Sequence, residues 1–243
     1  MPWPFRKPPP LNHQLEKMRA DWDLRARENA RHFIATTQEQ WTDEEFFSSG
    51  ELAVKQLILS DMANICQDRQ PSGMRVLEIG CGVGRITRAL AQTFGEIYAV
   101  DVSGEMIEQA RTALAAFPNA HLYRNNGTDL SVVPDIPFDF AFSVIVFQHI
   151  PSQSIVENYI REVHRLLRPG GLFKFQVNGI AHCGRLGRIL PARLRRATPA
   201  NTWLGAPVSE EEALRMAERS GFECRYRLGA GTQDFWLWFF KPE

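Results

Sequence analysis

The chain has 243 residues, of which 44% are hydrophobic and 23% are charged, and its formal net charge at pH 7 is zero. A chain of this length forms one large domain or one domain with appendages, and the neutral balance argues against a dedicated nucleic-acid binder, so we expect no DNA partner. The four cysteines form no C-x-x-C pair, which disfavours both a disulfide framework and a zinc site. No apolar run reaches roughly 18 residues and no hydrophobic signal core begins the chain, so the sequence predicts a cytoplasmic protein without an integral membrane segment.

Residues 1–70 are predicted to form a tail and a helical cap, and residues 71–243 the main domain. Five prolines within residues 1–10 exclude a helix there. Apolar residues then recur every three or four positions from Leu15 to Phe33, which is typical of an amphipathic helix of about 25 residues. A second helix is expected over residues 52–66. The aromatic residues of the connecting stretch are Trp41, Phe46 and Phe47.

The stretch from Arg75 to Thr87 predicts a strand, a glycine turn and a helix. A short apolar run of the kind found in buried parallel strands comes first. Glycines follow on alternate positions, where the backbone can turn tightly and a ligand can lie against it. Helical spacing then begins at Arg85, and a helix start offers unpaired N–H groups to an anion. The three glycines are Gly80, Gly82 and Gly84.

The residues around this turn favour a ligand with an amino-acid end and a ribose but no phosphates. The dinucleotide pattern is G-x-G-x-x-G, but here the third glycine comes one residue early and Arg85 takes its place. The carboxylate of Glu78 suits a cationic amino group better than a pyrophosphate. Asp101 ends the next predicted strand, where an acidic residue accepts ribose hydroxyls. S-adenosylmethionine (SAM) fits all three features.

Three stretches resemble the motifs of one family, the class I SAM-dependent methyltransferases. They are Glu78-Ile-Gly-Cys-Gly-Val-Gly84, Val100-Asp-Val-Ser103 and Arg168-Pro-Gly-Gly171. The resemblance covers about 100 central residues, from Arg75 to Val177. It implies a Rossmann-like α/β three-layer sandwich with a seven-stranded, mostly parallel sheet and a C-terminal antiparallel hairpin strand. It also implies that Glu78 holds the amino end of SAM, the turn including Cys81 its carboxylate end, and Asp101 its ribose.

The resemblance also implies where adenine lies. Ser103 is predicted to cap a helix that runs to Ala116, and residues after the second motif contact adenine in this family. A polar turn after the third predicted strand, Ala120–Arg124, supplies the remaining adenine contacts in similar enzymes. The candidates are Val102, Met106, Gly127, Thr128 and Asp129. Packing by Met106 and simple turn formation by the polar residues stay open as alternatives.

The carboxyl end of the strand expected over 138–146 faces the methyl group in this family. Phe147 is placed there beside the cofactor, and His149 is the ionisable side chain that could take a proton from an acceptor near neutral pH. A purely structural role for His149 stays open. The chain lacks both the tetrapeptide of DNA-base amine methylation and the acidic cluster of metal-dependent catechol-type enzymes. We therefore expect transfer to a small molecule without a metal.

The N-terminal helices of similar small-molecule enzymes often cover the cofactor. Trp22, Phe33 and Trp41 would then form a lid that excludes water, although packing in the core explains the same rings. A basic helical insertion is expected over 179–207, with Arg185, Arg188, Arg193, Arg195 and Arg196. It is a solvated helix, a lid that selects an anionic acceptor, or a contact for a membrane surface or RNA phosphates.

The last third of the chain is expected to complete the sheet. A helix over 152–167, a strand over 172–177, a helix beginning after Ser209 and two strands over 223–228 and 235–240 are predicted. The sequence therefore predicts methyl transfer from SAM to an oxygen, nitrogen or carbon nucleophile of a small molecule. The alternatives are an RNA or protein methyltransferase, a nicotinamide oxidoreductase and a non-catalytic SAM-binding module. The oligomeric state stays unknown.

Overall fold

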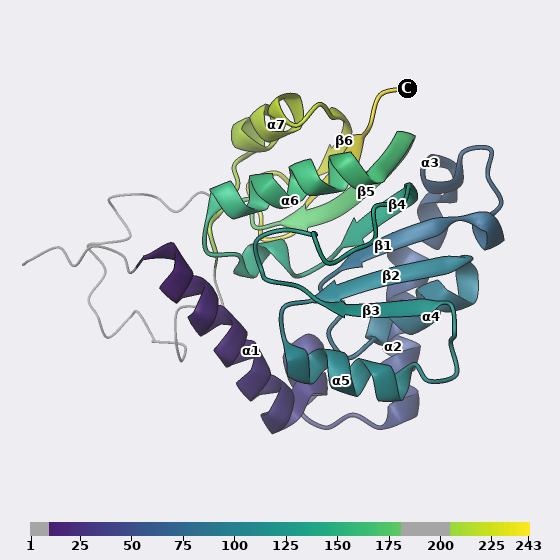
Figure 1. The fold of residues 1–243 in the computed structure, drawn as a ribbon, viewed down its shortest axis with the longest axis vertical. Coiled ribbons are helices and arrows are strands. Elements are labelled where there is room, and N and C mark those ends of the chain that lie inside the picture. Colours follow the sequence, from purple (N-terminus) through teal and green to yellow (C-terminus); the bar gives the residue numbers. More distant parts are fainter. Residues whose placement is uncertain (1–9, 181–204) are drawn as a thin grey trace, which may run out of the picture.

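In the computed structural model, which describes residues 10–180 and 205–243, seven strands form one sheet in the order β3-β2-β1-β4-β5-β7-β6 (Figure 1). β7 pairs antiparallel with β5 and β6, and the other neighbours are parallel. This confirms the predicted seven-stranded α/β sheet. The strands are β1 (Arg75–Ile79), β2 (Glu96–Asp101), β3 (Ala120–Arg124), β4 (Phe138–Ser143), β5 (Leu167–Val177), β6 (Glu223–Leu228) and β7 (Phe235–Phe240).

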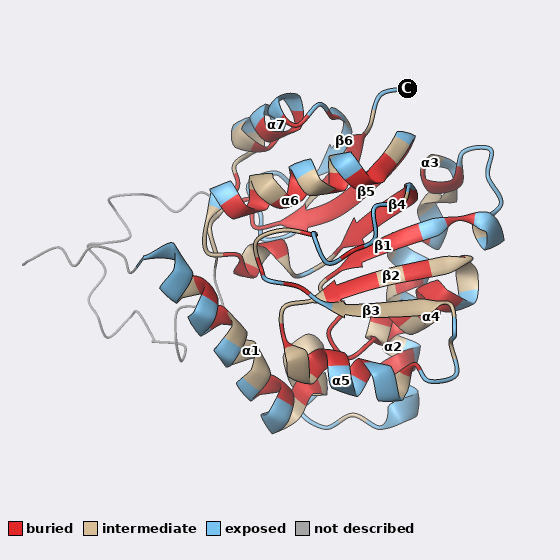
Figure 2. Cartoon of the chain, viewed as in Figure 1, coloured by how far each residue is buried: buried red, intermediate tan, exposed pale blue. Residues whose placement is uncertain are grey.

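Helices cover both faces of the sheet, and the central strands are buried on both sides (Figure 2). The segment 181–204, which holds the five arginines of the predicted basic insertion, lies outside the described residues. The helices are α1 (Leu11–Ile34), α2 (Asp43–Leu57), α3 (Met62–Cys66), α4 (Arg85–Thr93), α5 (Gly104–Ala113), α6 (Gln153–Leu166) and α7 (Glu210–Arg219). Short 3₁₀ turns are η1 (Leu59–Asp61), η2 (Pro71–Gly73) and η3 (Phe147–His149).

Alternation along the strands divides the core into two parts. On one face, Leu77 and Ile79 of β1 pack with the apolar stripes of α6 and α7. On the other, Val76 packs with α2, α3 and α4. Since successive strand residues point to opposite faces, Glu78 projects to the same side as Val76. This places its carboxylate beside the start of α4, the helix that follows the glycine turn.

The prediction of one helix over 52–66 is wrong at its start and in its continuity, although the helical segment does end at Cys66. Helix α2 begins at Asp43, because Thr42 and Glu45 form a capping box in which each side chain accepts a hydrogen bond from the other's backbone N–H. The chain then breaks at η1 before the short helix α3. Phe46 and Phe47, expected in a connecting stretch, are therefore buried helical residues.

Two strand bounds also differ from the prediction. β4 ends at Ser143 rather than Val146, since Ile145 adopts a positive φ of 57° that no strand continues. β5 begins at Leu167 rather than Leu172, so the Arg168–Gly171 turn is part of its first half. Both changes leave the carboxyl ends of β1, β2 and β4 facing α1, which crosses that edge of the sheet (Figure 1).

Candidate functional site

A cavity of about 550 Å³ lies at the carboxyl ends of the parallel strands, beneath α1. Ligands in open α/β sheets bind at this edge. Its walls come from the glycine turn, the ends of β2 and β3, the loop after β4, the N-terminal helices and the β6–β7 turn. Nine of the predicted site residues line it: Glu78, Gly80, Cys81, Gly82, Asp101, Val102, Met106, Gly127 and His149.

The glycine turn needs its glycines for conformation and for space. Gly80 and Gly82 have positive φ values of 81° and 55°. A Cβ on Gly80 would lie 2.1 Å from a methyl carbon of Val146, and one on Gly82 would lie 2.6 Å from Cδ1 of Ile34. The turn is therefore pressed between the β4 loop and the end of α1, and its open side faces the cavity.

Glu78 is a buried carboxylate of which one oxygen lacks a hydrogen-bond partner. It is 3% exposed, and its Oε2 has no hydrogen-bond partner among the described residues. Burial raises the pKa of Glu78 to about 7, and the positive charge of Arg85 offsets part of that rise. A cationic donor entering the cavity would satisfy this oxygen and return the carboxyl group to its charged form.

Asp101 stands at the end of β2 with half of its hydrogen-bonding capacity in use. Its Oδ2 accepts from the backbone N–H of Gly82 at 2.9 Å, and its Oδ1 accepts from that of Ser103 at 2.9 Å. Burial raises the pKa of Asp101, and these N–H donors offset part of the rise. A carboxylate has about four lone-pair sites, so two remain for a pair of hydroxyls.

Arg85 is the cation at this end of the cavity. Its Nη1 donates to the backbone oxygen of Ser49 at 3.2 Å, and burial lowers the pKa of Arg85. The N–H groups of Gly80, Cys81 and Gly82 already donate to Val100 or Asp101. Arg85 was identified in the sequence only as a departure from the dinucleotide pattern, yet it lines the cavity.

Four predicted site residues do not line the cavity. Gly84 caps α4 and faces Leu114. Thr128 and Asp129 bond to one another and to Asn126, so they stabilise the turn after β3. Phe147 is 1% exposed and packs on aromatic core rings, because the 3₁₀ turn directs it inward while Gln148 and His149 reach the cavity.

Asn125 is a cavity residue that sequence reasoning missed. It is 6% exposed, its Nδ2 donates to the hydroxyl of Tyr159 at 2.7 Å, and its Oδ1 has no partner among the described residues. Both residues line the cavity. The signal was its place directly after β3, but the polar run that follows contains several similar candidates.

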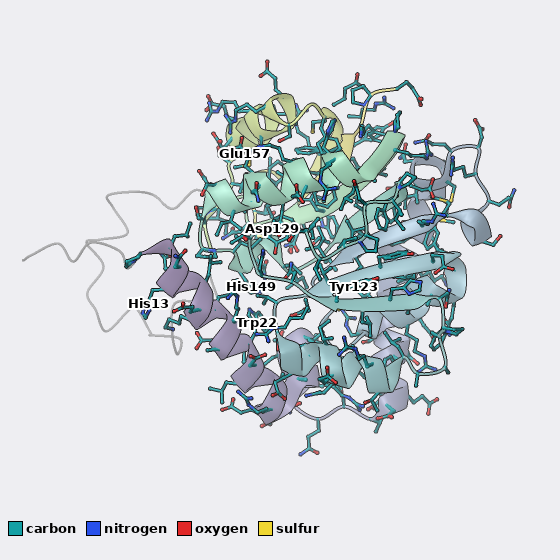
Figure 3. The ribbon with its side chains drawn as sticks, in the orientation of Figure 1. His13, Trp22, Tyr123, Asp129, His149 and Glu157 are labelled. Carbon is teal, nitrogen blue, oxygen red and sulfur yellow. The ribbon has the colours of Figure 1, made fainter. Side chains whose placement is uncertain are left out.

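Helix α1 closes the cavity from the side opposite the sheet. Trp22, Phe33 and Trp41 all line it. Trp22 packs edge-on against His149, which is 5% exposed, and Figure 3 shows both side chains between α1 and the strand ends. Asp23 accepts hydrogen bonds from Ser103 Oγ at 2.6 Å and from the N–H of Glu105 at 3.3 Å. The helix thus contacts the cavity wall at His149 and the start of α5 beside Asp101.

The residues present fit a ligand with a cationic amine and a ribose. The unpartnered Oε2 of Glu78 suits an ammonium group, and the spare lone pairs of Asp101 suit a diol. Two buried carboxylates disfavour phosphates at the same place. Among the described residues, no three His, Cys, Asp or Glu side chains come together as metal ligands. No described helix has the length and apolar character to span a membrane.

Comparison of the sequence with known proteins finds methyltransferases. A family described as a methyltransferase domain matches residues 76–171. The 2-methyl-6-phytyl-1,4-hydroquinone methyltransferase of Synechocystis sp. is 29% identical over 106 residues, which are 43% of this chain and 32% of that protein. The ubiquinone biosynthesis O-methyltransferase of Xanthomonas axonopodis pv. citri is 27% identical over 135 residues, 55% of each chain.

The chain spans between 32% and 61% of the length of the curated relatives that it matches. Among solved structures, magnesium protoporphyrin IX methyltransferase from Synechocystis, with bound S-adenosylhomocysteine, has a TM-score of 0.65 at 16% identity and covers 94% of this chain and 99% of its own. Phosphoethanolamine N-methyltransferase 1 of Haemonchus contortus has a TM-score of 0.66 at 14% identity, over 94% of this chain and 49% of its own. These two structures share the fold.

Proposed function

We propose that this chain, which belongs to the class I SAM-dependent methyltransferase family, transfers a methyl group from SAM to a small-molecule acceptor. The observation that carries the proposal is the meeting of Glu78, the glycine turn and Asp101 in one cavity. Among the proteins that this chain resembles, the names give as acceptors 2-methyl-6-phytyl-1,4-hydroquinone, demethylmenaquinone, malonyl-[acyl-carrier protein], magnesium protoporphyrin IX and phosphoethanolamine, most of which are small molecules.

The proposed cofactor contacts follow from the cavity groups that still have hydrogen-bonding capacity. Glu78 accepts from the ammonium group of SAM, and Asp101 accepts from the two ribose hydroxyls. Arg85 is the group that we assign to the carboxylate end, because the N–H groups of residues 80–82 already have partners. Charge-assisted bonds of this kind are stronger than neutral ones.

For the adenine end we propose a contact that differs from the expected one. Val102, Met106 and Gly127 supply the apolar walls, and they line the cavity. The expected polar contacts, Thr128 and Asp129, are engaged in their own turn. Asn125 has the buried, unpartnered carbonyl oxygen that an exocyclic amine needs. Asn125 therefore takes the role that the sequence assigned to its neighbours.

SAM supplies a methyl group on a positively charged sulfur, which is already a reactive donor. The protein orients the acceptor, and such positioning contributes about 7–11 kcal/mol to lowering a barrier. Trp22, Phe33 and Trp41 exclude water from the reacting atoms. His149 takes the proton that the acceptor loses on methylation, as a general base at the acceptor end.

The test is calorimetric titration of the purified chain with SAM, S-adenosylhomocysteine and NADH. Micromolar binding of both adenosyl compounds and none of NADH is expected. A folded protein that gives no heat with either adenosyl compound contradicts the proposal, and preferential binding of NADH supports an oxidoreductase instead. Turnover with small-molecule, RNA and protein acceptors then separates an enzyme from a binding module, and a small-molecule enzyme from the other classes.

A further inference from the structure

A buried glutamine, Gln176 of β5, joins three segments that wall the cavity. It is 1% exposed, and its Oε1 accepts a hydrogen bond from the N–H of Ile145 at 2.8 Å. Its Nε2 lies within bonding distance of Gln148 Oε1 at 3.3 Å, Gln233 O at 2.8 Å and Asp234 Oδ1 at 3.1 Å. The loop after β4, the η3 turn and the β6–β7 turn are thereby fixed relative to one another.

Asp234 is the charged group that Gln176 holds at the cavity, where it is an exposed residue of the wall. It lines the cavity from the β6–β7 turn, and it directly precedes Phe235, the buried first residue of β7. Its N–H donates to Thr232 Oγ1 at 3.2 Å, so both the backbone and the side chain of Asp234 are held by hydrogen bonds. Oδ1 accepts from Gln176, while Oδ2 makes no hydrogen bond with the described residues.

The surroundings of Asp234 suit a positive charge. Within the described part of the chain, its partners are the neutral Gln176 and Thr232, and no cation pairs with it. The arginine on the cavity wall, Arg85, belongs to the α4 end and bonds to Ser49. On the remaining wall, the rings of Trp22 and Phe33 already hold the guanidinium of Arg25, 4.8 and 5.9 Å from their centroids, so they do not add to the binding of a second cation. The carboxylate of Asp234 is the group that a ligand cation would meet, because an unpaired carboxylate forms its strongest hydrogen bonds with charged donors.

Asp234 also lies near the proposed base. Gln148 Oε1 and Asp234 Oδ1 contact the same nitrogen of Gln176, and Gln148 Nε2 lies 3.3 Å from His149 Nε2. A ligand group bound by Asp234 therefore sits on the acceptor side, beside His149, and away from Glu78 and Asp101, which serve the cofactor.

We infer that Asp234 determines acceptor specificity by binding a protonated amine on the acceptor, and that Gln176 is the positioning residue that aims it. The inference rests on the proposed function, since it concerns the acceptor half of the same cavity. It differs from the anionic acceptor that the arginine-rich segment suggests, and that segment lies outside the described residues. The amine serves recognition, and the methylated atom need not be the same nitrogen.

The test is a fragment screen by ligand-observed NMR on the full chain saturated with S-adenosylhomocysteine. The set contains primary amines, carboxylic acids and neutral amides in equal numbers, built on the same phenyl and indole cores. Wild type, Asp234→Asn and Asp68→Asn are compared, since Asp68 is an exposed aspartate outside the cavity. Saturation by S-adenosylhomocysteine is measured first, and its absence contradicts the proposed function rather than this inference.

Amines are expected to dominate the hits with wild type and with Asp68→Asn, and to lose about tenfold in affinity with Asp234→Asn. Gln176→Leu, which removes the amide that holds Asp234 without adding a charge, is expected to weaken amine binding in the same direction. Three results overturn the inference: equal or greater binding of acids by wild type, an amine preference that survives Asp234→Asn, and no fragment bound by a protein that does bind S-adenosylhomocysteine.

Discussion

Trp22 and His149 meet edge-on across the cavity, with ring centroids 5.3 Å apart and an interplanar angle of 70°. The residue after Trp22, Asp23, bonds to the N-terminal turn of α5 beside Asp101. Two adjacent residues of α1 therefore reach His149 and the start of α5, on two sides of the cavity. This relationship makes the N-terminal helix part of the site and also part of the core, so the two interpretations of its aromatic residues are compatible.

His149→Asn is expected to lower kcat by a factor of about 100 or more, with SAM affinity changed less than threefold, because a general base contributes about 10²–10⁴-fold. Single-turnover rates and calorimetry with SAM measure the two quantities. Gln153→Ala, at an exposed position a few residues further on and outside the cavity, is the control for a change near the turn. A fall in turnover below tenfold for His149→Asn, with SAM binding intact, would rule out proton transfer by this residue.

Asp23→Ala is expected to loosen α1 from α5 and to lower both stability and SAM affinity. The carboxylate accepts from Ser103 Oγ and Glu105 N, and loss of a side chain that bonds a helix N-terminus costs about 1–2 kcal/mol. Urea unfolding and calorimetry with SAM check the two effects. Glu16→Ala, an exposed change on the same helix, should alter neither. Unchanged SAM affinity in Asp23→Ala would mean that α1 closes the site without help from this bond.

The fold and the meeting of Glu78, the glycine turn and Asp101 in one cavity were predictable because each depends on local sequence. The glycine turn, Glu78 and Asp101 are set by one strand–turn–helix unit and the strand after it, and motif spacing captures both. The start of α2 was also readable, since Thr42 and Glu45 stand at capping-box spacing, although the prediction overlooked it. The sequence could not show which of Phe147 and His149 faces the cavity, because the 3₁₀ turn determines the direction of each side chain.

The rest of the cavity wall could not be predicted, because distant segments build it. Gln176 and Asp234 are 58 positions apart, and only the antiparallel pairing of β5 with β7 brings them together. Asn125 is separated from Tyr159 by 34 positions and depends on the packing of α6 over β3. Residues such as these belong to no motif and no periodic pattern in the sequence. Only the folded structure shows that they lie at the site.

Glu78 should make SAM binding depend on pH near neutrality. Burial raises its pKa to about 7, and the charged form binds an ammonium group, so affinity should rise as pH increases through 7. With one such group, affinity at pH 8 should exceed that at pH 6 by about tenfold. Calorimetry at both values checks this. Glu78→Gln should bind weakly at pH 8 and show no such rise. A wild-type affinity that is flat over this range would contradict the role of Glu78.

The same pKa has the opposite consequence for the protein without ligand. Because the folded state holds the proton more tightly than the unfolded chain, the group favours folding at low pH, and this contribution is lost as pH rises from about 4.5 to 7. The loss is roughly 3 kcal/mol at full burial. Glu78→Gln should therefore be more stable than wild type at pH 8 and similar to it at pH 5, as measured by urea unfolding. If Glu78→Gln and wild type are equally stable at both pH 5 and pH 8, the carboxyl group is not desolvated.

Ile145 holds a strained backbone at the end of β4, and relief of that strain should stabilise the protein. A β-branched residue at φ 57° is costly, by about 1–2 kcal/mol, whereas asparagine tolerates this region. Ile145→Asn keeps the N–H that donates to Gln176 Oε1, so the hydrogen bonds of Gln176 should persist. We expect a gain of about 1 kcal/mol in unfolding free energy, together with a higher KM for the acceptor, since the apolar side chain lines the cavity.

Val132→Asn is the matched control for this change, because Val132 is an exposed turn residue without a positive φ and lies outside the cavity. It should not stabilise the protein, and it should leave the KM unchanged. If Ile145→Asn destabilises as much as the control does, the left-handed backbone carries no strain. If it stabilises but leaves the KM unchanged, the isoleucine is not kept for acceptor binding. Stabilisation together with weaker acceptor binding would show that the strain persists because the site requires this side chain.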